Sequence, residues 1–209
     1  MQRNKNMTVM KALFGVGNIY FQTTASVFKP IIAMDIYCRF KPTSILDFTM
    51  GWGGRLVGAC ALNIPHYIGV DSNHNLEAPY KQMTEFLKQH SSTQARLIFQ
   101  DALTVDYSKL TYDLVLTSPP YYNIETYGNT DTEQLKSKQE WNDTFYIPIL
   151  QKTFKHLKNG GHYCLNVPVE IYKAVVLPTL GNPMKKIELR HAKRGQQNMY
   201  HEYIYVWKK

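Results

Sequence analysis

The stretch Ser44-Ile-Leu-Asp-Phe-Thr-Met-Gly-Trp-Gly-Gly-Arg55 decides the fold. It starts with a short apolar run that is typical of a buried strand, and Asp47 ends that run. Closely spaced glycines then permit a tight turn with close backbone approach, and residues 55–62 continue in a helical pattern. A glycine-rich turn from strand to helix is typical of nucleotide sites in open α/β sheets. The stretch therefore predicts an α/β fold with a ligand at this turn.

Two carboxylates narrow the kind of ligand. Asp47 at the strand tip suits a cationic group better than a pyrophosphate, and no lysine follows the glycines as a phosphate-binding loop would require. Asp71 ends the next short strand. Its separation from Asp47 along the sequence is close to the roughly 20 residues that bring an acidic residue to ribose hydroxyls in a βαβ unit. The alternatives are a solvated loop position for Asp71 and a place in the core for Trp52.

A second motif, Thr117-Ser-Pro-Pro-Tyr121, directly follows the apolar run 114–116. The proline pair can continue neither a helix nor a strand ladder, so it holds Ser118 and Tyr121 in a stiff turn past the end of a strand. Ligands of open α/β sheets bind at the carboxyl ends of strands. The proline pair alone fits an ordinary strand-ending turn, but its polar and aromatic neighbours favour a site.

The two motifs together resemble those of the S-adenosylmethionine-dependent DNA amino methyltransferases, which methylate adenine N6 or cytosine N4. The family's catalytic pattern is a polar residue, two prolines and an aromatic, as in Ser118 to Tyr121. Its first motif, Asp-Pro-Phe-Ala-Gly-x-Gly-Gly, resembles residues 47–54, with Phe48 and Met50 as departures. The resemblance covers about residues 28–208 and implies the methyltransferase form of the Rossmann-like fold, with S-adenosylmethionine as cofactor.

The resemblance also implies which residues form the site. An exocyclic amine is a poor nucleophile because its lone pair is delocalised into the base. Acceptors aimed at the amine hydrogens, here the Ser118 hydroxyl and the Pro119 carbonyl, would free the lone pair, and Tyr121 would stack on an extruded base. The implied catalytic residues are Ser118, Pro119, Pro120 and Tyr121. The implied cofactor contacts are Phe28, Lys29, Pro30, Asp47, Thr49, Gly51, Trp52, Gly53, Asp71, Ser72, Asp101, Ala102 and Ser118.

Composition sets the class of protein. The chain has 209 residues, 44% of them hydrophobic, which is enough for one folded domain, and its net charge of +8 favours a nucleic-acid partner. The cysteines and histidines show no metal-ligand spacing, so no metal is expected, and the absence of a disulfide framework indicates a reducing compartment, cytoplasmic or nuclear. No apolar run approaches the roughly 18 residues of a membrane span, and residues 1–11 lack a signal-peptide core.

The order of elements predicts the architecture. Strand and helix patterns alternate to about residue 180, and two late strands close the chain. We expect a seven-stranded, mostly parallel sheet with one antiparallel edge strand and helices on both faces. This single domain would span residues 25–209 after a loosely ordered arm, residues 1–24. The helices expected are 30–39, 76–90, 141–157 and 171–180.

Two polar segments are candidates for holding the substrate. Residues 124–140 are too long for an ordinary connection and predict a mobile loop at the site, or else a surface loop without a role. Residues 191–201 form a predicted hairpin tip whose cations suit phosphates. The substrate-binding candidates are Tyr122, Asn123, Lys193 and Arg194.

Several functional alternatives stay open at this point. DNA is favoured, with cytosine N4 ahead of adenine N6 because of Ser118, while RNA or a protein amine remains an alternative substrate. A catalytically silent nucleic-acid-binding subunit with the same fold is a third reading. The region available for target recognition is small, which suggests a dimer or a partner subunit.

Overall fold

The computed structural model describes residues 27–122, 137–189 and 202–209. Outside these ranges lie the expected N-terminal arm, the part of the expected mobile loop up to residue 136, and the hairpin tip. The substrate candidates Asn123, Lys193 and Arg194 are therefore outside the described residues.

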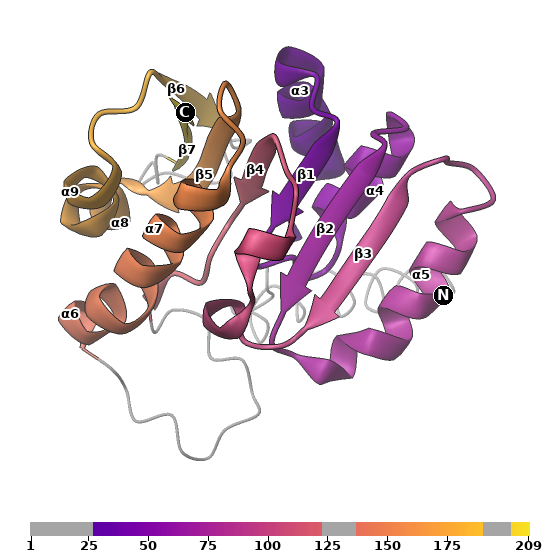
Figure 1. Ribbon diagram of the computed structural model, residues 1–209, viewed down its shortest axis with the longest axis horizontal. Coiled ribbons are helices and arrows are strands. Elements are labelled where there is room, and N and C mark those ends of the chain that lie inside the picture. Colours follow the sequence, from indigo (N-terminus) through magenta and orange to yellow (C-terminus); the bar gives the residue numbers. More distant parts are fainter. Residues whose placement is uncertain (1–26, 123–136, 190–201) are drawn as a thin grey trace, which may run out of the picture.

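A seven-stranded sheet forms the centre of the molecule, in the order β3-β2-β1-β4-β5-β7-β6 (Figure 1). The five strands β1 to β5 run parallel to one another, as expected for strands joined by helical crossovers. The strands are β1 Ser44–Asp47, β2 His66–Asp71, β3 Gln94–Phe99, β4 Leu114–Thr117, β5 His162–Pro168, β6 Lys185–Leu189 and β7 Glu202–Lys208.

The antiparallel strand does not lie at the edge, so that part of the expectation is wrong. β7 runs antiparallel to β5 on one side and to β6 on the other. The last strand of the chain is inserted between two earlier ones, and β6 forms the edge. The sequence shows that β6 and β7 are consecutive strands, but it does not show which of them pairs with β5.

Helices cover both faces of the sheet. One face is covered by α3 Pro30–Phe40, α4 Gly54–Ala61 and α5 Glu77–Leu87. The other carries α6 Lys138–Trp141, α7 Ile147–His156, α8 Val169–Ile171 and α9 Leu177–Leu180. The short 3-10 turns are η2 His74–Leu76, η3 Ala102–Thr104 and η4 Tyr107–Lys109, and two π-helical segments are η6 Asn142–Tyr146 and η7 Tyr172–Val176.

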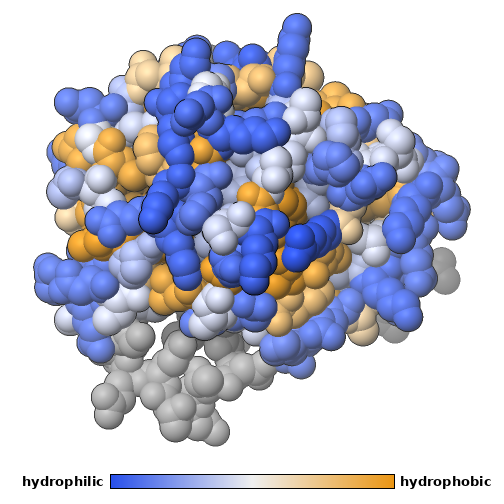
Figure 2. All heavy atoms as spheres, viewed as in Figure 1, coloured by the Kyte–Doolittle hydropathy of each residue, from blue (hydrophilic) through white to orange (hydrophobic). Residues whose placement is uncertain are grey.

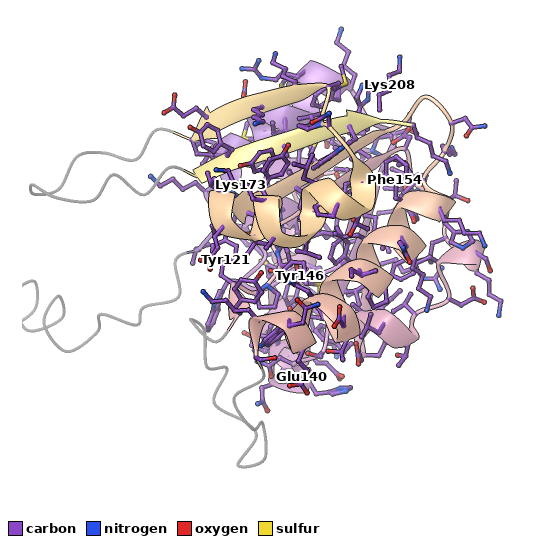
Figure 3. All side chains as sticks on the ribbon, turned by 90° about the vertical axis from the view of Figure 1, so that its left-hand side faces the viewer. Tyr121, Glu140, Tyr146, Phe154, Lys173 and Lys208 are labelled. Atoms are coloured by element: carbon purple, nitrogen blue, oxygen red, sulfur yellow. The ribbon has the colours of Figure 1, made fainter. Side chains whose placement is uncertain are left out.

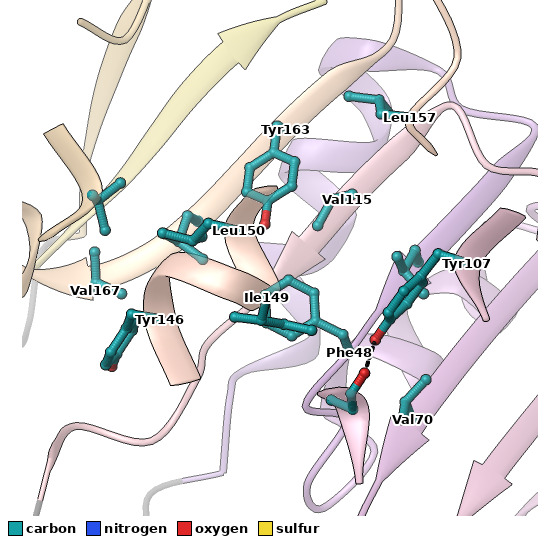
Figure 4. Close-up of a cluster of buried hydrophobic side chains, with 14 of the residues drawn as sticks. Phe48, Val70, Tyr107, Val115, Tyr146, Ile149, Leu150, Leu157, Tyr163 and Val167 are labelled. Atoms are coloured by element: carbon teal, nitrogen blue, oxygen red, sulfur yellow. Dashed lines mark hydrogen bonds between the residues drawn. The ribbon is translucent and has the colours of Figure 1, made fainter. Parts of the chain in front are cut away.

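The central strands are apolar on both faces because helices pack on each. Side chains alternate between faces along a strand, so Leu46 and Val115 pack under α7 while Ile45 and Leu114 pack under α3 and α4. Figure 4 shows the first of these clusters, in which Tyr107 donates a hydrogen bond to the Ala102 carbonyl. This explains why these strands appear in the sequence as continuous apolar runs.

The helix expected at 141–157 begins at Lys138. Ser137 caps it, since its hydroxyl accepts a hydrogen bond from the Glu140 amide at 3.1 Å. Residues 138–140 therefore belong to the helix and not to the expected loop. The sequence α6–η6–α7 is one continuous helical run, and the π turn precedes Pro148, where a residue without an amide hydrogen is accommodated.

Figure 2 shows hydrophilic side chains over most of the face that it draws, with apolar patches between them. Among the helices of the described ranges, none has the length and apolar character that a bilayer crossing requires.

Candidate active site

The strand order brings the two motifs together. The chain passes from β1 to β2 and β3, then returns to place β4 on the other side of β1. Ile45 pairs with Leu114 and Leu46 with Val115, so the two strands end at the same edge of the sheet. This is the switch point at which open α/β sheets bind ligands. The glycine turn and the Ser118 turn therefore leave the sheet next to each other.

The glycine turn is built for close backbone approach. Gly51 has φ 52° and Gly53 has φ 82°, both in the left-handed region. A Cβ added to Gly54 would lie 1.9 Å from the Phe28 carbonyl oxygen, so only glycine fits there. Helix α4 thus begins against Phe28, and the segment that the resemblance assigned to the cofactor does lie beside the turn. Lys29 is exposed on that segment, and Pro30 opens α3.

Asp71 and Tyr80 hold the turn in place. The Gly51 amide donates to one Asp71 carboxylate oxygen at 2.9 Å, and the Asn73 amide donates to the other at 2.9 Å. The Tyr80 hydroxyl donates to the Gly51 carbonyl at 2.9 Å. Asp71 fixes the turn through these hydrogen bonds. Because its side chain is only half-buried, the carboxylate is also exposed beside the turn. Sequence reasoning anticipated a role for Asp71 but had no signal for Tyr80, which looks like a core aromatic.

Asp47 has a different position from the one expected. Its side chain is fully buried and accepts hydrogen bonds from Arg55 Nε at 2.6 Å, Tyr67 at 2.6 Å and Thr117 at 2.9 Å. A direct cofactor contact by this carboxylate is not available in this geometry. Asp47 instead ties the end of β1 to α4, β2 and β4, and so supports the turn from below.

The groups around Asp47 are held in their hydrogen-bonding states. Burial lowers the pKa of Arg55, but the charge and hydrogen bond of Asp47 outweigh burial and raise it, so the guanidinium stays charged. Burial, followed by the charge of Asp47, raises the pKa of Tyr67, so this hydroxyl keeps the hydrogen that it donates. Arg55 also donates to the Thr49 carbonyl and lies 4.9 Å over the Phe28 ring.

The remaining cofactor candidates lie at or near the same edge. Trp52 is 62% exposed, which excludes a place in the core. Thr49 is half-exposed on the turn, where the resembled pattern has phenylalanine, a further departure. Ser72 is exposed after β2. Asp101 is exposed after β3, accepts a hydrogen bond from the Leu103 amide at 2.8 Å, and precedes the buried Ala102.

The Ser118 turn is anchored from both sides. The Ser118 and Tyr121 hydroxyls are 3.1 Å apart and share a hydrogen bond. Pro119 is buried, and the Pro120 carbonyl accepts a hydrogen bond from Tyr146. Tyr121 is half-buried and lies toward the margin of the described residues in Figure 3, whereas Tyr146 is fully buried. The turn therefore presents Ser118 and Tyr121 together.

Tyr122 is not available to a substrate, so this expectation is wrong. It is 4% exposed, its hydroxyl donates to Asn142 at 3.1 Å, and its ring lies edge-on to Tyr146 at 5.9 Å. Its φ of 50° places its backbone in the left-handed region. Tyr122 is adjacent to Tyr121 in the sequence, but its side chain packs in the core.

Within the described ranges, no three histidine, cysteine, aspartate or glutamate side chains gather so as to hold a metal ion. Cys60 and Cys164 are buried, and burial raises the pKa of both thiols. Neither is therefore poised to act as a thiolate nucleophile.

Comparison with known proteins relates part of the chain to a methyltransferase. No protein-family model matches the chain. A stretch of 90 residues is 32% identical to the type II methyltransferase M.MjaVI of Methanocaldococcus jannaschii. The match spans 43% of this chain and only 44% of that relative.

Solved structures show the same fold at low identity. TrmN from Thermus thermophilus has a TM-score of 0.57 and 18% sequence identity, and the likeness covers 90% of this chain and 51% of the TrmN chain. A Listeria monocytogenes protein provisionally assigned as a class I S-adenosylmethionine-dependent methyltransferase has a TM-score of 0.57 and 19% identity, covering 86% and 58%. Sheet order, motif positions and these likenesses agree that the chain has the Rossmann-like fold of the S-adenosylmethionine-dependent methyltransferases.

Proposed function

We propose that the chain transfers a methyl group from S-adenosylmethionine to the exocyclic amine of a base in DNA, with cytosine N4 favoured over adenine N6. The observation that carries this proposal is the adjacency of the glycine turn after β1 and the Ser-Pro-Pro-Tyr turn after β4. A methyl donor on the first turn and an amine on the second would lie next to each other. The likeness of part of the chain to a type II methyltransferase supports the same reading.

The glycine turn fits the cofactor. The lack of a side chain at Gly51, where an added Cβ would meet nothing within 4 Å, lets a ligand approach the backbone, and half-buried Asp71 offers a carboxylate to ribose hydroxyls. Trp52 and Phe28 supply aromatic surface around the turn. The bound cofactor would supply a methyl group activated by a sulfonium charge.

The Ser118 turn supplies what the amine needs. Ser118 Oγ and the Pro119 carbonyl are acceptors for the two amine hydrogens, and the Ser118–Tyr121 hydrogen bond fixes the rotamer of the hydroxyl. Tyr121 offers its ring to the extruded base. Direct transfer needs no covalent intermediate, which agrees with the buried thiols of Cys60 and Cys164.

Partner and location complete the proposal. The net charge of +8 favours a polyanionic substrate. Because only the loop at residues 124–140 and the C-terminal hairpin are available for reading a target sequence, we expect a second copy or a partner subunit to contribute to recognition. Three free cysteines favour a reducing compartment, the cytoplasm or the nucleus.

The decisive experiment is nucleoside mass spectrometry. DNA and RNA would be incubated separately with the protein and S-adenosylmethionine that carries a deuterated methyl group. We expect labelled N4-methylcytosine from DNA. Labelled N6-methyladenine would show that adenine is the target base and would leave the mechanism unchanged. Label in RNA alone would show that the substrate is RNA and not DNA. No label in either nucleic acid, with cofactor binding intact, would contradict the proposed activity.

Replacing Asp71 with alanine is expected to weaken S-adenosylmethionine binding by about 1.5–3 kcal/mol, because a charged acceptor is lost. Isothermal titration calorimetry measures this directly. Asp106→Ala is the matched control, since Asp106 likewise accepts a hydrogen bond from a backbone amide, that of Ser108 at 3.2 Å, but caps η4 instead of the glycine turn. Equal affinities of the wild-type protein and the Asp71→Ala variant for S-adenosylmethionine would show that Asp71 does not contribute to cofactor binding.

A further inference from the structure

A line of hydroxyl groups connects the two motifs. Thr49 Oγ, on the glycine turn, lies 2.6 Å from Thr117 Oγ, which directly precedes Ser118. Thr117 donates to Asp47 Oδ1 at 2.9 Å. Thr117 and Asp47 are fully buried, whereas Thr49 is half-exposed. The line therefore runs from the surface of the turn to a buried carboxylate.

The hydrogens of this line have one consistent arrangement. A threonine hydroxyl has a single hydrogen, and a carboxylate paired with arginine can only accept. The hydrogen of Thr117 therefore goes to Asp47, which Arg55 holds at 2.6 Å. The bond between the two threonines must then use the hydrogen of Thr49. No described residue donates to Thr49 Oγ, so this oxygen presents only lone pairs to a ligand.

The position of Thr49 Oγ indicates which part of the cofactor would lie nearest to it. In the proposed reaction the methyl donor lies on the glycine turn and the amine on the Ser118 turn. Thr49 Oγ is hydrogen-bonded to the hydroxyl of Thr117, the residue before Ser118, so it lies on the side of the glycine turn next to the Ser118 turn. For the methyl group to reach the amine, the sulfonium centre must lie close to the space between the two turns. An oxygen that can only accept attracts a cationic centre and gains nothing from a neutral sulfur.

We propose, on the basis of the proposed function, that Thr49 distinguishes the methylated cofactor from its demethylated product. Its oxygen favours the sulfonium of S-adenosylmethionine over the neutral thioether of S-adenosylhomocysteine, and so favours product release. Thr117 is a positioning residue, because it fixes the hydrogen of Thr49 away from the ligand. Thr49 is a departure from the pattern that residues 47–54 resemble, which has phenylalanine at this position.

Calorimetry with the two ligands tests this inference. Thr49→Val is expected to weaken S-adenosylmethionine binding by about tenfold, with little loss for S-adenosylhomocysteine, because the lost interaction is with a charge. Thr49→Ser should keep the wild-type preference. Thr117→Val should reduce the preference as well, since it frees the Thr49 hydrogen to point at the ligand. A residue that only supported the turn would change both affinities together.

Thr43→Val is the matched control. Thr43 donates its hydroxyl hydrogen to Asp113 at 2.5 Å at the opposite end of β1, so the same substitution removes the same kind of bond away from the site. Thermal melting verifies that each variant is folded, and Thr49→Ser and Thr117→Val keep the test available if Thr49→Val does not fold. Parallel losses for both ligands, or an unchanged preference in Thr49→Val and Thr117→Val, would overturn the inference. A wild-type protein that binds neither ligand would instead contradict the proposed function, and the inference with it.

Discussion

Replacing Tyr121 with alanine is expected to lower kcat/KM by about 10- to 100-fold while the affinity for S-adenosylmethionine stays within about twofold. Stacking of a base on an aromatic ring contributes roughly 1–3 kcal/mol, and this contact is made by the substrate and not by the cofactor. Tyr121 is half-buried at the end of the Ser118 turn, and its hydroxyl is 3.1 Å from Ser118. Steady-state kinetics and calorimetry on the same preparation measure the two effects.

Tyr121→Phe separates the ring from the hydroxyl. It keeps the stacking surface and removes the hydroxyl that is hydrogen-bonded to Ser118, so we expect a smaller loss than for alanine. Phe86→Ala is a control on the opposite side of the sheet, since this exposed aromatic lies on α5. If Tyr121→Ala lost cofactor affinity together with activity, the turn would be structural and the proposed mechanism would fail.

Replacing Arg55 with methionine is expected to destabilise the protein by about 3–5 kcal/mol, because it leaves the carboxylate of Asp47 buried without its cationic partner. Both side chains are almost fully buried, and Arg55 also donates to the Thr49 carbonyl. Chemical denaturation monitored by circular dichroism gives the change in the free energy of unfolding.

A double variant identifies the cause of that loss. Asp47→Asn combined with Arg55→Met removes both charges and should be less destabilised than the sum of the single variants, since no unpaired charge remains. Arg39→Met is the matched control, because Arg39 pairs with Asp35 at 2.8 Å on the exposed face of α3. Exposed ion pairs contribute only about 0–1 kcal/mol. A small effect of Arg55→Met, similar to that of Arg39→Met, would contradict the role assigned to this pair.

Much of the fold followed from local sequence patterns. The runs before Asp47 and Ser118 are strands because short apolar segments end at a carboxylate or at a proline pair, and α3 and α4 follow from helical spacing. The glycines of the turn and the stiff Ser118 motif are also local, since they depend on backbone conformations that neighbouring residues set. These features identified the motifs and the class of site before any tertiary contact was known.

The roles of individual side chains depended on the tertiary structure. Asp47 and Tyr122 have the residue types of ligand-binding positions, yet both are buried, the first against Arg55 and the second against Asn142. Their partners come from other elements of the fold, so no local pattern reveals them. In the same way, nothing in Thr49 or Thr117 alone predicts that their hydroxyls meet.

By itself, the sequence determined the strands, most of the helices and the two turns that carry chemistry, because each depends on residues close together in the chain. Only the tertiary structure decided that β4 returns beside β1, that β7 lies between β5 and β6, and that Asp47 supports the turn from within the core. Strand order and burial are set by packing between distant segments, where one arrangement competes with others of similar local propensity. The site of this protein exists because that packing brings the ends of β1 and β4 together.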